Sequence, residues 1–261
     1  MDLTKLSDIK DILMKNNLFA NKSFGQNFLI DRNILNIIID AAEIAEDDTI
    51  IEIGPGLGVL TEELCKKAKK VLSIELDRNM VRIVKENMKD RKNLEIIEMD
   101  ALTFTPPEIK YKVVANIPYN ITSPLISLFL GAKNRPTTIT LLTQKEVAEK
   151  IGKVPPYASI LPLRVGLNGT AKIIQKVSKN CFYPAPKVDS AILKIKLNDD
   201  FSQEEILQIE KIAKIAFSGK RKKLSNTLKT LIPNKENFPV DLEKRPQNLS
   251  LEEWRTLAKN C

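Results

Sequence analysis

A glycine-rich turn is the first feature of the sequence that could bind a ligand. Gly54-Pro55-Gly56-Leu57-Gly58 follows an apolar, β-branched run and opens a helical stretch. Glycine in such a turn lets the backbone bend tightly and approach a ligand that a Cβ atom would exclude. The dinucleotide fingerprint places its third small residue where Val59 stands, whereas here the third glycine comes one position earlier. This spacing favours a nucleoside that carries no pyrophosphate.

Acidic residues end three successive expected strands, at Glu52, Glu75 and Asp100. Because the carboxyl ends of parallel strands meet at one edge of a sheet, these side chains are expected to face the same crevice. Glu75 can accept hydrogen bonds from both hydroxyls of a ribose, and Asp100 can accept one from an adenine amino group. The acids and the glycine turn together predict adenosine binding.

The elements that must position these residues alternate between strand and helix from about Thr49 to Gln144. Such alternation predicts a Rossmann-like α/β fold, with a mostly parallel sheet covered by helices on both faces. Two further strand-like runs flank a proline-rich bend at 184–186 with no helix between them. They predict an antiparallel hairpin at the edge of the sheet.

The chain is expected to form two domains, residues 1–200 and residues 201–261. Residues 1–48 form an N-terminal helical and lid segment of the first domain. Beyond residue 201 the β-branched runs stop, and helical periodicity is interrupted only by prolines. Ser250 and Glu253 have the spacing of a capping box at the start of the last helix.

Positive charge is unevenly distributed along the chain, whose net charge is +8. No acid occurs between Glu149 and Asp189 or between Glu210 and Glu236, although both stretches are rich in lysine and arginine. Segregated positive charge favours a nucleic-acid backbone as partner, and a merely solvated basic surface is the alternative. The candidate RNA contacts are Lys187, Lys220, Arg221, Lys222 and Lys223.

Composition excludes several other classes of site. The chain has no histidine, which rules out imidazole-based triads and histidine-bearing zinc centres. Its three cysteines, Cys65, Cys181 and Cys261, lack the close spacing of a metal or redox motif and are expected to be reduced thiols. No signal peptide or membrane span is expected, and no metal.

The segment Asn116-Ile117-Pro118-Tyr119 ends the fourth expected strand. It resembles the motif of N6-adenine methyltransferases, which have Asn or Asp, any residue, Pro and then an aromatic residue. More narrowly, the chain resembles the ribosomal RNA small-subunit adenine N6,N6-dimethyltransferase family of the KsgA (RsmA) type. The resemblance rests on five blocks in the family's order: KSFGQNFL (22–29), NIPYNITSP (116–124), FYPAPKVDS (182–190), KRKKLSN (220–226) and RPQNLS (245–250).

This resemblance implies a class I methyltransferase fold with S-adenosyl-L-methionine as cofactor. The cofactor-binding residues it implies are Gln26, Asn27, Leu29, Gly54, Gly56, Glu75, Leu76, Asp100, Ala101 and Asn116. The Asn116 amide oxygen and the Ile117 carbonyl would accept hydrogen bonds from the two N–H groups of the target amine. Pro118 would orient the Ile117 backbone. Tyr119 would stack on the target base, and Phe182 either clamps that base from the other side or packs in the core.

The implied substrate is adjacent adenosines of 16S rRNA in an immature small ribosomal subunit, methylated during ribosome biogenesis. The implied enzyme is a cytoplasmic monomer, with residues 201–261 as its RNA-binding domain. One alternative is an Erm-type methyltransferase of 23S rRNA, although Lys187-Val188-Asp189-Ser190 differs from that branch, which usually has Asn before Ser. Another alternative is a non-catalytic RNA-binding factor, which the intact motif residues disfavour.

Overall fold

The structure is a computed structural model that describes residues 2–19, 25–152, 155–219, 221–232, 236 and 238–261. The motif residues 22–24 and the candidate RNA contact Lys220 lie outside the described residues. The chain divides into two compact units, Met1–Ala148 with Lys172–Lys196 and Glu149–Ala171 with Leu197–Cys261. Each unit is described separately below.

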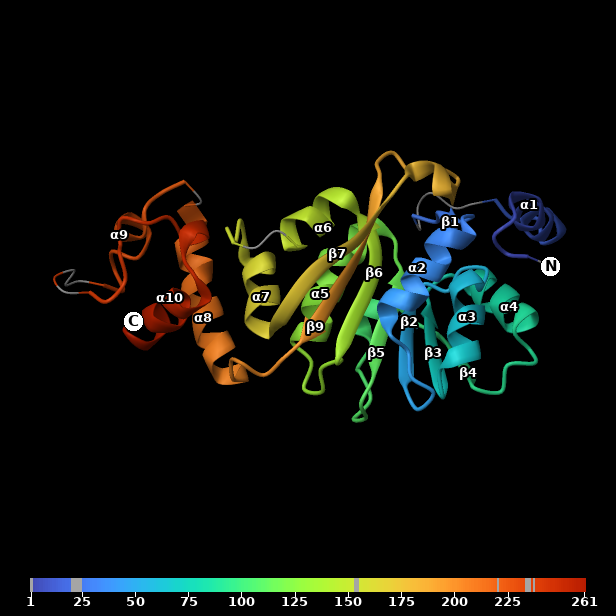
Figure 1. The fold of residues 1–261 in the computed structure, drawn as a ribbon, viewed down its shortest axis with the longest axis horizontal. Helices are drawn as coiled ribbons and strands as arrows, with labels where there is room; N and C mark the ends of the chain where they lie inside the picture. Colours follow the sequence, from blue (N-terminus) through green and yellow to red (C-terminus); the bar gives the residue numbers. More distant parts are fainter. Residues whose placement is uncertain (1, 20–24, 153–154, 220, 233–235, 237) are drawn as a thin grey trace. The chain divides into compact units, whose positions relative to one another are not determined.

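A seven-stranded sheet forms the centre of the first unit, in the order β4-β3-β2-β5-β6-β9-β7 (Figure 1). The first five strands of this order pair in parallel, and β9 pairs with β6 in the antiparallel direction. The predicted α/β fold with an antiparallel edge is therefore confirmed. The strands are β2 Thr49–Ile53, β3 Lys70–Glu75, β4 Leu94–Glu98, β5 Lys112–Asn116, β6 Thr138–Gln144, β7 Gly169–Val177 and β9 Ser190–Leu197.

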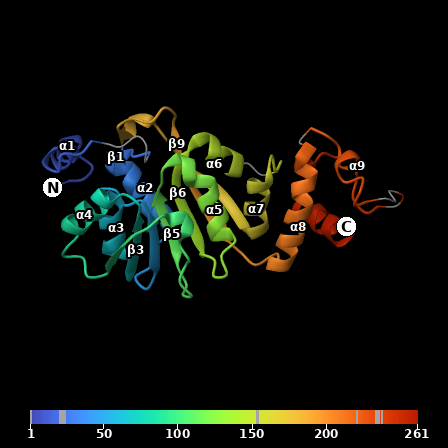
Figure 2. The same ribbon diagram turned by 180° about the vertical axis from the view of Figure 1, so that it is seen from behind.

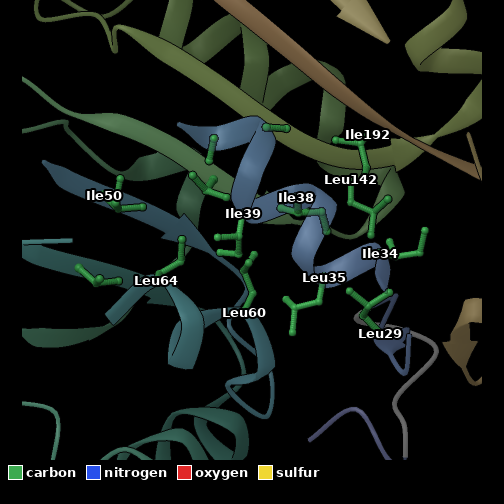
Figure 3. Close-up of a cluster of buried hydrophobic side chains, with 14 of the residues drawn as sticks. Leu29, Ile34, Leu35, Ile38, Ile39, Ile50, Leu60, Leu64, Leu142 and Ile192 are labelled. Carbon is green, nitrogen blue, oxygen red and sulfur yellow. The ribbon is translucent and has the colours of Figure 1, made fainter. Parts of the chain in front are cut away.

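Helices cover both faces of this sheet, with α2 on one face and α5 on the other (Figures 1 and 2). The helices of this part are α2 Arg32–Ala42, α3 Val59–Lys67, α4 Arg78–Asn87 and α5 Thr122–Leu130. The apolar side of α2 points toward α3 and toward the strands β6 and β9 (Figure 3). Fully burying each such Leu or Ile side chain contributes about 1.5–3 kcal/mol to folding.

Two smaller elements lie beside the sheet in the first unit. Helix α1, Leu6–Lys15, precedes a two-stranded antiparallel sheet in which β1, Phe28–Leu29, pairs with β8, Phe182–Tyr183. Among the described residues, single turns of 3-10 helix occur at Ala101–Thr103, Tyr119–Ile121, Lys179–Cys181, Phe217–Gly219 and Pro246–Asn248.

The second unit is helical and packs around the buried Trp254. Its helices are α7 Ile160–Asn168, α8 Gln203–Ala216, α9 Leu224–Thr227 and α10 Leu251–Lys259, whereas α6, Lys145–Gly152, crosses the division between the units. Helix α10 begins with the predicted capping box of Ser250 and Glu253.

The division of the chain differs from the predicted boundary at residue 200, because residues 149–171 group with the C-terminal helices. Leu163 and Leu167 of α7 are buried in the same apolar cluster as Trp254. In addition, Arg164 forms a two-pronged ion pair with Glu210 of α8. A buried apolar face and a partly buried ion pair thus hold α7 to the C-terminal helices.

No helix within the described ranges combines the length and the apolar character that a membrane crossing requires.

Candidate active site

The glycine-rich turn between β2 and α3 has the backbone conformation that its sequence suggests. Gly56 and Gly58 have φ angles of +57° and +96°, a region that side-chain-bearing residues rarely adopt. A Cβ atom at Gly58 would lie 2.8 Å from Met88 Cε and 3.1 Å from Val84 Cγ2. The left-handed backbone at position 58 therefore favours glycine, and a side chain there would also have to displace the flexible end of Met88 and crowd Val84.

A cavity of about 330 Å³ opens where strands of the parallel sheet end, and we call it the strand-end cavity. All ten residues expected to bind the cofactor line it, together with Ile117, Pro118 and Tyr119. These residues come from the segment before α2 and from the ends of β2, β3, β4 and β5. The structure thus brings together residues that lie as far apart in sequence as Gln26 and Tyr119.

Glu75 is held in place by backbone groups on either side of its carboxylate. Oε2 accepts a hydrogen bond from the Gly56 amide at 3.3 Å, and Oε1 accepts one from the Asp77 amide at 2.9 Å. Burial raises the pKa of Glu75, and these backbone hydrogen bonds oppose that rise. Each carboxylate oxygen can accept a further hydrogen bond. The residue is therefore placed to accept a pair of neighbouring ligand hydroxyls.

Glu52 does not face the crevice, which corrects the expectation drawn from its position near the end of β2. Its carboxylate accepts hydrogen bonds from Thr61 Oγ1 of α3 at 2.8 Å and Ser73 Oγ of β3 at 2.5 Å. Burial raises the pKa of Glu52 to about 7. The reason for the different orientation is that side chains alternate between the two faces of a strand, and that of Glu52 lies beneath α3. Only Glu75 and Asp100 of the three acids line the cavity.

Asp100 and Leu76 form a more exposed part of the cavity lining. Asp100 caps the short helical turn that follows it by accepting a hydrogen bond from the Leu102 amide at 2.9 Å. Leu76 is 54% exposed, which is unusual for a leucine next to buried strands. An apolar side chain beside a carboxylate suits a flat heterocycle with a hydrogen-bonding edge.

The segment from Asn116 to Tyr119 leads from the end of β5 into the 3-10 turn at Tyr119–Ile121. Pro118 has φ −54° and ψ 133°, and Ile117 is buried. Asn116 donates from Nδ2 to the Asn27 carbonyl at 3.4 Å, so its Oδ1 remains the atom that can accept from a substrate. The Tyr119 hydroxyl forms a 2.6 Å hydrogen bond with Oγ of the fully buried Ser190. The tyrosine ring is therefore tethered at its far end to β9.

The segment before α2 is tied to the cavity by its own polar groups. Gln26 donates from Nε2 to Asp77 Oδ2 at 2.9 Å, and Asp77 also caps α4. Asn27 donates from its side-chain Nδ2 to the Gly25 carbonyl at 2.9 Å. Leu29 lines the cavity and is 1% exposed. The Gln26 bond holds the segment to the turn that follows β3, whereas the Asn27 bond shapes the segment itself.

Phe182 lies in a different environment from the other candidates. It is 3% exposed, pairs with Leu29 across the two-stranded sheet, and belongs to the apolar cluster around α2. It is not among the described residues that line the strand-end cavity. This placement favours packing over the base clamp, which remains a prediction.

The described candidate RNA contacts do not line the cavity; Lys187 belongs to the first unit, and Arg221, Lys222 and Lys223 belong to the second. Lys187, Arg221, Lys222 and Lys223 are exposed, and Lys223 pairs with Glu243 at 2.6 Å. We call residues 221–223 the basic C-terminal segment. Arg164, which belongs to one of the acid-free stretches, is neutralised by Glu210 and is not available to a phosphate.

Sequence reasoning missed several residues of the site. Leu3 and Ile9 of the N-terminal region line the cavity, as does Leu57 of the glycine turn. Asp77 and Ser190 position Gln26 and Tyr119 without lining it. Ser190 belongs to a motif block that the resemblance already used, whereas nothing in the pattern of the first 17 residues indicates a ligand.

Comparison with known proteins identifies the family of the chain. The family model described as ribosomal RNA adenine dimethylase matches residues 17–261. The "ribosomal RNA small subunit methyltransferase A" proteins of Clostridium botulinum (strain Kyoto / Type A2) and Dehalococcoides mccartyi (strain ATCC BAA-2100 / JCM 16839 / KCTC 5957 / BAV1) are 40% and 37% identical to the chain. The matches cover 95% of this chain and 96% of the first relative, and 97% of this chain and 92% of the second.

Two solved structures are also similar over most of the chain. A dimethyladenosine transferase from Plasmodium falciparum has a TM-score of 0.76 at 31% identity and covers 88% of this chain and 95% of its own. The 23S rRNA methyltransferase ErmE has a TM-score of 0.76 at 29% identity and covers 90% of this chain and 99% of its own. The resemblance inferred from the motifs is confirmed by the family match, and the chain belongs to the ribosomal RNA adenine dimethylase family.

Proposed function

We propose that this protein transfers methyl groups from S-adenosyl-L-methionine to N6 of adjacent adenosines in 16S rRNA, which yields N6,N6-dimethyladenosine during ribosome biogenesis. The observation that carries the proposal is the shared cavity of Glu75 and the Asn116–Tyr119 segment. The part around Glu75 suits a nucleoside, and the part around the Asn116–Tyr119 segment suits an amino group on a flat base.

The residues present fit S-adenosylmethionine. The two oxygens of Glu75 would accept the ribose hydroxyls, while Leu76 and Asp100 would contact the face and the amino edge of the adenine. Gly56 leaves room for the ligand beside Phe28, because a Cβ atom there would already lie 3.4 Å from that ring. When bound, the cofactor supplies a methyl group on a positively charged sulfur.

The Asn116 segment would prepare the target nitrogen for methylation. An adenine amine is a poor nucleophile because its lone pair is delocalised into the ring. Asn116 Oδ1 and the Ile117 carbonyl would accept hydrogen bonds from the two N–H groups of the amine. These bonds favour a tetrahedral nitrogen with a localised lone pair. The same two oxygens would stabilise the positive charge that develops on the nitrogen during transfer, and the methylated nitrogen would then release one proton to water. Tyr119, tethered to Ser190, offers a fixed face on which an unstacked base can rest.

The exposed Arg221 and Lys222 support RNA as the partner of the second unit. Lysine and arginine side chains that are free of protein carboxylates can release counterions from a phosphate backbone when they bind it. We propose that the basic C-terminal segment contacts rRNA, with Lys187 as a further contact from the first unit.

The decisive experiment measures methyl transfer from labelled S-adenosylmethionine to small ribosomal subunits isolated from cells that lack this enzyme. Mass analysis of the nucleosides should detect dimethyladenosine at adjacent positions. Large subunits and naked 23S rRNA serve as the comparison, because the similarity to ErmE makes 23S rRNA the alternative substrate. Labelling of 23S rRNA alone would overturn the proposed substrate while retaining the proposed chemistry.

A further inference from the structure

Helix α1 contributes apolar side chains to the strand-end cavity. Leu3, which precedes the helix, and Ile9, on the helix, are 4% and 1% exposed, and both line the cavity. The helix lies beside α4 and β1 (Figures 1 and 2). Its apolar side packs in one cluster with Phe28, Leu57 and Ile83. Two of these neighbours, Phe28 and Leu57, also line the cavity, so the helix is continuous with its wall.

A chain of ion pairs holds the start of this region against the body of the first unit. The Asp2 carboxylate accepts from Arg32 of α2 at 2.6 Å, and the same guanidinium donates to Glu63 of α3 at 3.0 Å. Asp2 also accepts from the amide and hydroxyl of Thr4, at 3.0 and 2.7 Å. These contacts lower the pKa of Asp2 to about 2, so the carboxylate stays charged at any physiological pH. One arginine therefore links the beginning of the chain to two helices.

A second attachment joins α1 to the two-stranded sheet beside the cavity. Lys10 Nζ lies 5.5 Å from the centre of the Tyr183 ring, within range of a cation–π contact. Tyr183 pairs with Phe28, a residue of the cavity wall. The helix is thus attached at its start through Asp2 and along its length through Lys10.

The match to the family model begins at residue 17, so it does not include α1. We propose that α1 is a wall of the cofactor-binding site, that Leu3 and Ile9 contact the bound nucleoside donor, and that the Asp2–Arg32–Glu63 ion pairs set how long the donor stays bound. This proposal rests on the proposed function of the cavity as the S-adenosylmethionine site. It adds binding residues that neither the motifs nor the family match assign.

Two matched pairs of variants of the full chain test the proposal with S-adenosylmethionine and S-adenosylhomocysteine. Calorimetry measures the affinity, and stopped-flow displacement measures the dissociation rate. Ile9→Ala is paired with Ile12→Ala, because Ile12 is buried in the same helix but lines a different cavity. Arg32→Ala is paired with Lys70→Ala, which breaks the exposed ion pair with Glu95 at 2.8 Å. Thermal unfolding of each variant shows whether it folds. If Ile9→Ala does not fold, Arg32→Ala still tests whether α1 contributes to donor binding.

We expect Ile9→Ala to weaken binding of both nucleosides about tenfold and Arg32→Ala to speed their dissociation about fivefold. Ile12→Ala should weaken binding less than Ile9→Ala, and Lys70→Ala should leave it unchanged. Wild-type affinity in Ile9→Ala together with a wild-type dissociation rate in Arg32→Ala would overturn the role of α1 and leave the proposed function intact. Absence of nucleoside binding by the wild type would instead overturn the proposed function of the cavity.

Discussion

The strand-end cavity and the basic C-terminal segment use polar side chains in different ways. In the cavity, Glu75 and Asn116 are partly buried, and hydrogen bonds with backbone groups hold their side chains in place. In the basic C-terminal segment, Arg221 and Lys222 are exposed on the surface of the second unit. Removal of one cavity residue should therefore cause a large loss of cofactor affinity or methyl-transfer rate. Removal of one surface charge should reduce the total electrostatic attraction for RNA only slightly.

The largest effect is expected for Glu75→Ala, which removes two charge-assisted hydrogen bonds to the cofactor. Each such bond contributes about 1.5–3 kcal/mol, so affinity for S-adenosylmethionine should fall by about 100-fold or more. Affinity for rRNA should barely change, because no basic residue is altered. Calorimetry measures both, with Glu95→Ala, an exposed acid of β4, as the control. Unchanged cofactor affinity would show that Glu75 does not hold the ribose.

The next effect concerns rate instead of affinity. Asn116→Ala removes one of two acceptors for the amine protons and should slow methyl transfer by about 100- to 1,000-fold, as the loss of one preorganised hydrogen-bonding group does elsewhere. RNA binding should be nearly intact. Single-turnover kinetics on unmodified and monomethylated substrate should differ, since the second step starts with one amine proton. A wild-type rate on both substrates would remove the catalytic role of this motif.

Glu52 provides a test within the first unit, because its carboxyl is buried but does not line the cavity. Its folded-state pKa of about 7 lies above the ordinary value of 4.5, so the folded protein retains a proton that the unfolded chain loses. This contribution to stability is complete below about pH 4.5 and is lost as the pH rises through about 7. Relative to Glu52→Gln, the wild type should lose about 3 kcal/mol of unfolding free energy over that range.

Urea unfolding of both proteins at about pH 5 and about pH 8 measures this difference. The other titrating groups contribute equally to the pH dependence of both proteins, so their contributions cancel in the comparison. A wild type and a Glu52→Gln variant with the same pH dependence would show that Glu52 is ionised in the folded protein.

A smaller effect is expected where Ser190 tethers Tyr119. Tyr119→Phe and Ser190→Ala each remove the same hydrogen bond, worth about 0.5–1.5 kcal/mol, and should slow methyl transfer by a similar, modest factor. The double variant should be no slower than either single variant, since the bond can be lost only once. Tyr119→Ala should cost more, about 1–3 kcal/mol, because stacking is lost as well. Additive effects of the first two changes would show that the tether does not act through this bond.

The smallest effect per residue is expected in the basic C-terminal segment. Replacing Arg221 and Lys222 by Gln should flatten the salt dependence of rRNA binding by roughly one unit of slope per lost phosphate contact. Lys223→Gln alone should change it less, because Lys223 already pairs with Glu243. Cofactor affinity should be unchanged. An unaltered salt slope would assign these charges to a solvated surface.

The sheet and the glycine turn could be predicted because strand runs, glycines and strand-ending acids are local patterns. The direction of Glu52 could not, since it depends on which face of β2 meets α3. The grouping of α7 with the C-terminal helices also depends on non-local contacts, above all the pair of Arg164 and Glu210. The part of α1 in the cavity was equally hidden, because burial of Ile9 against a ligand site and burial in an ordinary core leave the same apolar pattern.

The pairing of β1 with β8 has a consequence for the order in which the protein folds. Phe28 lies opposite Tyr183, more than half the chain length away, and Ile30 donates to the Cys181 carbonyl at 2.9 Å. Contacts between such distant positions close a long loop, which costs chain entropy. A nascent chain that already contains the glycine turn, Glu75 and Asn116 therefore still lacks the strand that fixes Phe28 and Leu29. The strand pairing of these two cavity residues can form only when residues 182 and 183 have been synthesised.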